Sequence, residues 1–264
     1  MAPFDVYVTK LTQYTVEMQG KGRQVREINC PTEVSALVAG LSLRVGRGAN
    51  SGIILREDTF VELGNPAQGS CAFLLWTDNP SLVRDGKITL VGPDIQESAG
   101  ASLPFGQVLV IGGMGLGREE HALLEQNQYV SDQIEGYMIR SMAQHMWSRV
   151  NKKAAEKGFC FETLGRALAA IFKSEVPKVQ AVEILFVTSS KEDLEQLDNI
   201  SRQVQKIARD IMRETWKAKG FDIFECNLGW DCNSCPDKPI CDDIRELSTV
   251  RKKKSSKIEN VTKS

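Results

Sequence analysis

Two runs of this sequence, Cys71–Trp76 and Val108–Ile111, are apolar at every position. A strand with one face in water alternates apolar and polar side chains, whereas a strand covered on both faces is apolar throughout. The two runs are therefore expected to be buried strands of a sheet that carries helices on both sides. Further strand-like runs are Phe4–Thr9, Leu11–Met18, Gly52–Arg56, Thr59–Leu63, Lys87–Val91, Gln107–Ile111 and Val179–Thr188.

Helical periodicity separates these strand-like runs. The first expected helix is capped by Thr32 and ends near Gly46 or Gly48, and the second runs from Glu119 to about Lys157 and includes a stripe of Met138, Met142 and Met146. A third covers Thr163–Lys173. A fourth follows a Ser189/Glu192 capping box and has an apolar stripe from Leu194 to Ile211. Strands that alternate with helices predict an α/β domain over residues 1–218, built as a mixed sheet flanked by helices.

Composition limits the classes of partner. The formal net charge of −1 gives no electrostatic argument for binding nucleic acid or a membrane surface. No run approaches the about 18–20 consecutive apolar residues that span a bilayer. The N-terminus lacks the basic start and apolar run of a signal peptide. We therefore expect a cytoplasmic protein with no nucleic-acid or membrane partner.

Four of the seven cysteines lie close together, at Cys226, Cys232, Cys235 and Cys241, in the pattern C-x5-C-x2-C-x5-C. In a cytoplasmic protein, clustered cysteines favour a metal over disulfides. Four thiolates suit either a [4Fe–4S] cluster or tetrahedral zinc. The single close pair and the Cys-Pro step after the third cysteine favour the iron–sulfur cluster, with zinc as the alternative and free thiols as the remaining one.

The cysteines also suggest how the C-terminal part is organised. Residues 219–250 are expected to form a small cluster-binding segment, and the basic residues 251–264 a disordered tail. Such a tail could dock an acidic partner such as a ferredoxin. Cys71 and Cys160 lie among apolar neighbours and are expected to be small core residues.

Several segments, in order, resemble the beta subunit of the carbon monoxide dehydrogenase/acetyl-CoA synthase complex. They span roughly residues 50–225 and are Ile54–Pro66, Phe73–Thr77, Asp85–Ile95, Leu103–Gly106, Glu135–Met138, Trp147–Phe159 and Val179–Thr188. The resemblance implies the central domain of that subunit and the start of its cluster-bearing region. It also implies anaerobic one-carbon metabolism, with protein partners such as a corrinoid protein or other subunits of the complex.

The sequence departs from the family in two ways. The spacing of its four cysteines differs from the synthase pattern, and the nickel-binding Cys-Gly-Cys motif is absent. The resemblance therefore implies an accessory iron–sulfur protein that relays electrons or docks a corrinoid protein or a coenzyme A thioester. Two alternatives stay open, a synthase-type acyltransferase subunit whose metal ligands are completed by a partner chain, and a zinc-stabilised interaction module.

The family's central domain is associated with the approach of coenzyme A, through arginines and a tryptophan. By position, the matching residues are Trp147, Arg140 and Arg149, and no catalytic residue is assigned. Guanidinium groups suit the phosphates of coenzyme A because they bind them in a bidentate manner. The alternative is that Trp147 packs in the core and the arginines only solvate the surface. Arg44, Arg47 and Arg56 are looser candidates.

Overall fold

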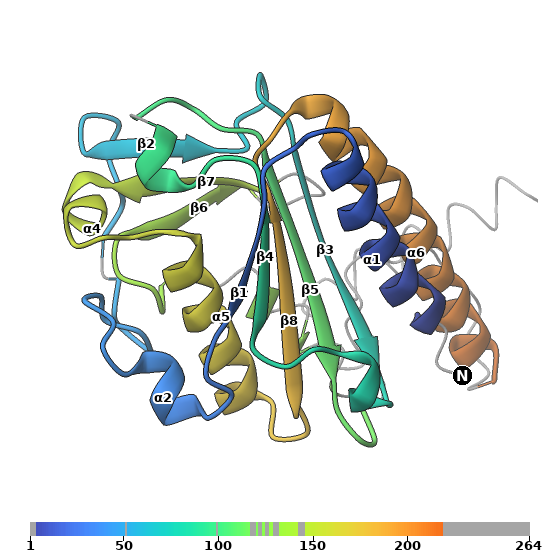
Figure 1. Ribbon diagram of the computed structural model, residues 1–264. Helices are drawn as coiled ribbons and strands as arrows, with labels where there is room; N and C mark the ends of the chain where they lie inside the picture. The colour runs from blue at the N-terminus through green and yellow to red at the C-terminus, as the bar shows by residue number, and fades with distance from the viewer. Residues whose placement is uncertain are drawn as a thin grey trace, which may run out of the picture. The chain divides into compact units, whose positions relative to one another are not determined.

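The computed structural model describes residues 4–50, 52–98, 100–116, 120, 123–124, 127–128, 132–141 and 146–218. Residues Met1–Ala208 belong to one compact unit. Its named elements are α1 (Asp5–Gly20), β1 (Val25–Asn29), α2 (Val34–Val38), β2 (Thr59–Leu63), β3 (Ser70–Thr77), η1 (Pro80–Leu82), β4 (Lys87–Val91), η2 (Ile95–Ser98), β5 (Phe105–Gly112), β6 (Tyr137–Ser141), β7 (Trp147–Asn151), α4 (Lys152–Glu156), α5 (Phe161–Glu175), β8 (Ala181–Val187) and α6 (Lys191–Ala218) (Figure 1).

Among the described residues, the larger sheet has the strand order β1-β4-β8-β5-β3. It is mixed, because β4 pairs with β8 and β3 with β5 in parallel, while β1–β4 and β5–β8 are antiparallel. Every residue of β5 and β8 is buried, as their largely apolar sequences predict. The predicted α/β class and mixed sheet are confirmed.

Helices cover both faces of this sheet. Helices α1 and α6 pack on one face, and α2 and α5 on the other (Figure 1). Side chains of β5 alternate between the two cores: Leu109 belongs to the core under α5, and Val108 to the core under α1 and α6. Gly106 lets α6 approach closely, since a Cβ there would lie 2.8 Å from Leu194 Cδ2.

The smaller sheet has the order β2-β7-β6 within the described part of the chain, and both of its pairings are antiparallel. Its inner face contributes Val61, Leu63, Tyr137 and Val150 to the core that α5 covers. Because successive residues of a strand point to opposite faces, Glu62, Met138 and Arg149 lie on its outer face. Register shifts interrupt both pairings, between Thr59 and Val61 and between Ile139 and Ser141.

Several predictions of secondary structure are wrong. The N-terminal runs Phe4–Thr9 and Leu11–Met18 form α1 and not strands, because Tyr7, Leu11, Tyr14 and Met18 recur at helical spacing and are buried against the sheet. The long helix predicted from Glu119 to Lys157 is wrong over β6 and β7. There, Gly136 has a φ of +73° and the chain turns into the strand β6. Met138 therefore lies in a strand and not in a helical stripe.

Strands β2, β3, β4, β5 and β8 and helix α5 lie where the sequence places them. The strand predicted over Gly52–Arg56 is wrong, because residues 52–56 form no strand. Helix α2 has Glu33 and not Thr32 at its N-cap, and it ends at Val38, well before Gly46. The cap of α6 comes from Ser190, whose Oγ accepts the backbone N–H of Asp193 at 3.3 Å, and not from a Ser189/Glu192 box. No helix in the described ranges is both long and apolar enough to cross a membrane.

Candidate functional site

Trp147 opens strand β7 and lies beside two arginines. The guanidinium carbon of Arg140 is 4.4 Å from the centre of the indole ring, and that of Arg149 is 6.0 Å away. Arg149 follows Trp147 by two residues on the same strand, so both side chains lie on the outer face of the small sheet. Arg140 comes from the register shift in β6, opposite the start of β7. The three residues that the resemblance selects therefore meet around one aromatic ring.

Arg149 is held firmly by its surroundings. Glu62 lies directly opposite it on β2, and Glu62 Oε1 accepts from Arg149 Nη2 at 2.6 Å and from Nε at 2.8 Å. Arg149 Nη1 also donates to the carbonyl of Ile54 at 3.3 Å. The side chain of Arg149 is only 9% exposed. A buried guanidinium with a carboxylate partner has little freedom to move, because separation from that partner would leave an unpaired charge in the protein interior.

Arg140 has a different environment. It is exposed, and its contact with the Trp147 ring is the one interaction that it makes with the described residues. A cation–π contact at an exposed position contributes about 0.5–1 kcal/mol, which is little compared with a buried ion pair. Its N–H donors therefore remain available to an anionic ligand.

The indole N–H of Trp147 is a further donor. Its Nε1 atom is buried and has no hydrogen-bond partner among the described residues. A buried donor without a partner costs about 1–3 kcal/mol, so such a group suggests a missing acceptor. Trp147 as a whole is half-buried, and part of the residue therefore remains accessible.

An extended segment, residues 52–55, covers Arg149 from outside the sheet. The backbone N–H of Ile54 donates to Met138 Sδ at 3.2 Å, and its carbonyl accepts from Arg149. Ile54 itself is buried, but the neighbouring Ile53 and Leu55 are 81% and 52% exposed. An apolar edge thus lies beside the arginine–tryptophan cluster. Exposed apolar residues next to Trp and Arg are typical of binding surfaces.

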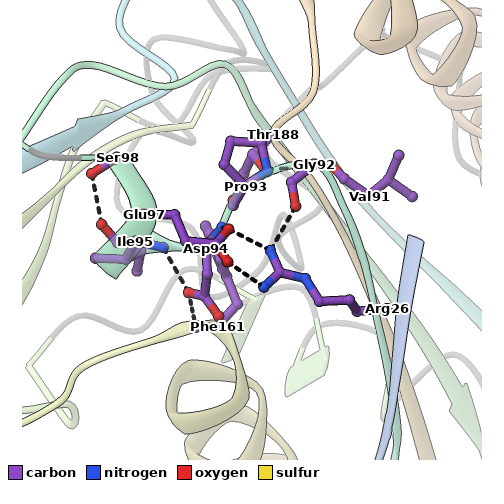
Figure 2. Close-up of polar contacts among 10 residues, drawn as sticks. All are labelled: Arg26, Val91, Gly92, Pro93, Asp94, Ile95, Glu97, Ser98, Phe161 and Thr188. Atoms are coloured by element: carbon purple, nitrogen blue, oxygen red, sulfur yellow. Dashed lines mark hydrogen bonds and ion pairs between the residues drawn. The ribbon is translucent and has the colours of Figure 1, made fainter. Parts of the chain in front are cut away.

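The carboxyl ends of β4 and β8, where open α/β sheets commonly bind ligands, are closed by internal contacts. Figure 2 shows Arg26 reaching across to Glu97 and the carbonyl of Gly92, with distances of 2.7–2.9 Å. Asp94 Oδ1 accepts from the backbone N–H of Phe161 at 3.0 Å and so caps α5. Thr188 Oγ1 donates to the Pro93 carbonyl at 2.7 Å. These groups stabilise the turn and leave the small sheet as the better candidate.

The looser arginine candidates are not part of the cluster. Arg44 and Arg47 are exposed and pair with Glu135 and Glu175. Arg56 is exposed, and no hydrogen bond or ion pair joins its side chain to another described residue. Ordinary surface pairs of this kind contribute little to binding or stability.

The cysteines outside the quartet behave as free thiols. Cys71 is 1% exposed in β3, and burial raises the pKa of its thiol to about 12, which keeps it protonated and unsuited to metal binding. Cys30 and Cys160 are half-buried. No group of three or more metal-ligating side chains occurs within the described ranges. Cys226, Cys232, Cys235 and Cys241 lie outside the described residues, as do His121 and His145.

Residues 42–193 match the family model described as CO dehydrogenase/acetyl-CoA synthase complex beta subunit. The chain belongs to this family. Glu62, Arg140, Trp147 and Arg149 all lie within the matched residues. The four clustered cysteines follow after them, so membership of the CO dehydrogenase/acetyl-CoA synthase beta family bears on the arginine–tryptophan cluster more directly than on the cysteines.

Curated proteins similar to this chain are also named as beta subunits. The chain is 27% identical over 80% of its length to acetyl-CoA decarbonylase/synthase complex subunit beta 1 of Methanosarcina thermophila. It is 27% identical over 81% of its length to the subunit beta of Archaeoglobus fulgidus, and 28% identical over 81% to that of Methanopyrus kandleri. The chain spans 42%, 39% and 45% of the length of these three relatives.

Sequence reasoning missed Glu62. The residue is a single carboxylate at an outward position of the run Thr59–Leu63, and this pattern equally fits a solvated strand face. Its partner, Arg149, lies 87 residues further along the chain. The one available signal was the charge itself in a strand otherwise made of Thr, Phe, Val and Leu.

Proposed function

We propose that this chain is an accessory iron–sulfur protein of the CO dehydrogenase/acetyl-CoA synthase beta family, which docks a coenzyme A thioester at Arg140, Trp147 and Arg149. The observation that carries the proposal is the convergence of the three residues on one indole ring, with a buried indole N–H that has no acceptor among the described residues. This arrangement supports an anionic ligand with polar acceptors.

The residues have distinct parts in this docking. Arg140 would bind a phosphate group, since it is exposed and has no carboxylate partner among the described residues. The half-buried Trp147 ring would pack against the ligand. The exposed Ile53 and Leu55 would contact apolar parts of the ligand or of a partner protein. Coenzyme A carries phosphates, amides and a thioester arm, and so offers each of these groups a counterpart.

The four cysteines would bind the cluster. Cys226, Cys232, Cys235 and Cys241 provide the thiolates that a [4Fe–4S] cluster requires, and such a cluster supplies one-electron chemistry when bound. The relatives are named as subunits of a complex, which supports protein partners for this chain. Other subunits of the complex, a corrinoid protein or a ferredoxin are the proposed partners.

Binding of coenzyme A tests the proposal. The full chain, purified without oxygen, carries phenylalanine in place of Trp76, Trp216 and Trp230, so that Trp147 alone emits. Titration with coenzyme A should give a saturable change in Trp147 emission, and Arg140→Gln should weaken it. Arg202→Gln is the matched control, because Arg202 is an exposed arginine on α6, which packs on the large sheet.

Two outcomes would contradict the docking role. One is the absence of a saturable change in Trp147 emission, with calorimetry also showing no heat of binding. The other is equal affinity in the Arg140→Gln and Arg202→Gln proteins. For the iron–sulfur part of the proposal, a colourless preparation with one zinc per chain would favour the zinc-stabilised module instead.

A further inference from the structure

Arg149 has a carboxylate partner, whereas Arg140 has none among the described residues. Glu62 Oε1 accepts from both Nη2 and Nε of Arg149, so that the guanidinium is bound along one edge. Both contacts are to the one oxygen Oε1, and together with the contact from Nη1 to the Ile54 carbonyl they restrict rotation of the guanidinium group. The direction of Arg149 relative to the indole ring is therefore set by Glu62.

Glu62 is itself held in place. Its backbone carbonyl accepts from the Leu103 N–H at 2.9 Å, and its Oε2 atom is 3.5 Å from the Asn65 amide nitrogen. Asn65 is fixed in turn, because its Oδ1 accepts the backbone N–H groups of Ala67 and Gln68 at 3.0 Å. A chain of contacts thus leads from the turn after β2, through Glu62, to Arg149.

Backbone pairing aligns the same residues. Glu62 and Arg149 are direct cross-strand partners, with Met138 of β6 opposite Arg149 on its other side. Cross-strand neighbours on one face lie within contact distance, so the pairing register alone brings the carboxylate to the guanidinium. A one-residue slip would turn Glu62 towards the core and separate the pair.

We propose that Glu62 is a positioning residue, which fixes Arg149 against one side of Trp147 and leaves Arg140 as the arginine that binds the ligand. The ligand part of this statement rests on the proposed function. Arg149 is held in one position beside the ligand, and the exposed Arg140 binds the anionic group of the ligand. The two arginines then have different effects on stability and on binding, although both contact the same ring.

The test compares Glu62→Gln, Arg149→Gln and their double variant in the protein in which Trp147 is the sole emitter. Glu62→Gln should free Arg149, shift Trp147 emission to longer wavelength without any ligand, and weaken coenzyme A binding about fivefold. Arg149→Gln should have a similar effect.

The double variant should lose no more coenzyme A affinity than either single variant, because both changes remove the same contact. Glu97→Gln, which breaks a Glu–Arg pair at 2.7 Å in another part of the fold, is the matched control and should leave the emission unchanged.

The outcomes separate the two proposals. If coenzyme A does not bind the parent protein, the docking role fails, and the ligand-free emission still decides the positioning of Arg149. Unchanged emission in Glu62→Gln, or losses of affinity that add in the double variant, would overturn the positioning role. Should Glu62→Gln not fold, Glu62→Asp keeps the charge but shortens the side chain by one methylene, and the same emission shift is expected. An unshifted Glu62→Asp would count against the inference.

Discussion

Arg23 Nε lies 2.9 Å from Asp193 Oδ2, and this contact ties the chain just after α1 to the first turn of α6. The Asp193 side chain is 2% exposed and also accepts from Ser189 Oγ at 2.6 Å. Tyr14 of α1 donates to the backbone carbonyl of Asp193 at 3.2 Å. The two helices that cover one face of the large sheet are thus joined through one acidic residue.

This junction predicts a dependence of stability on pH. Burial raises the pKa of Asp193, but hydrogen bonds from Ser189 and Ser190 and the charge of Arg23 together outweigh burial, so the pKa is lowered from 3.8. A carboxyl with a lowered folded-state pKa stabilises the fold fully above its unfolded pKa, and loses that contribution as the pH falls through the folded value.

Asp193→Asn should therefore lower the free energy of unfolding by about 1–3 kcal/mol at pH 7, because hydrogen bonds to a charged group are lost. The loss relative to the parent protein should shrink below about pH 4, where the carboxyl of the unfolded parent begins to take up a proton, and should disappear once the pH falls below the lower folded pKa. Urea unfolding at pH 7 and at pH 3 measures both values. An equal loss at the two pH values would contradict the assignment.

Gly64 and Gly158 form a matched pair of left-handed glycines, with φ of +67° and +84°. A Cβ on Gly64 would lie 2.5 Å from the backbone carbonyl oxygen of Met146, whereas a Cβ on Gly158 would meet nothing within 4 Å. Gly158→Ala should cost about 1 kcal/mol through backbone strain alone. Gly64→Ala should cost about 3 kcal/mol, because the clash adds to the strain.

The position of Gly64 makes its substitution informative about the site. The Met146 carbonyl directly precedes Trp147, so Gly64→Ala should also change Trp147 emission, whereas Gly158→Ala should not. Thermal unfolding and emission spectra of both variants check the two expectations. Equal stability losses would show that the approach of β2 to β7 is looser than the structure describes.

Arg140→Gln should separate binding from stability. Arg140 is exposed and has no ion pair with the described residues, so the free energy of unfolding should fall by no more than about 1 kcal/mol, the contribution of its exposed cation–π contact. Coenzyme A affinity should fall about tenfold, which corresponds to about 1.4 kcal/mol for one charge-assisted contact. The affinity of the parent protein should weaken with added salt more steeply than that of Arg140→Gln. Identical salt dependence in the two proteins would contradict an anion-binding role.

The cysteine quartet predicts metal content. The parent chain, isolated without oxygen, should be brown and hold about four irons and four sulfides. Cys235→Ser should lose most of this iron, because the close pair formed with Cys232 provides two of the four thiolates. Cys160→Ala is the control, since it removes a half-buried thiol outside the quartet. Iron retained in Cys235→Ser would remove that residue from the ligand set.

The site illustrates what kind of information the sequence holds. Trp147, Arg140 and Arg149 could be selected from the sequence through the family resemblance, although they lie in strands where the periodicity predicts a helix. Their roles could not be distinguished, because the burial of Arg149 and the exposure of Arg140 depend on the strand pairing. Glu62 entered the site only through its register with β7.

The sequence by itself determined the largely apolar strands, such as β5 and β8, and the amphipathic helix α5, because each carries its pattern within a short local window. Only the tertiary structure decided that residues 137–141 and 147–151 pair as strands, and that the N-terminal segment is a helix. In both segments the spacing of methionines and tyrosines fits a helix, whereas the residue types around them also fit a strand. The packing partners, which lie far away in the chain, select between the two.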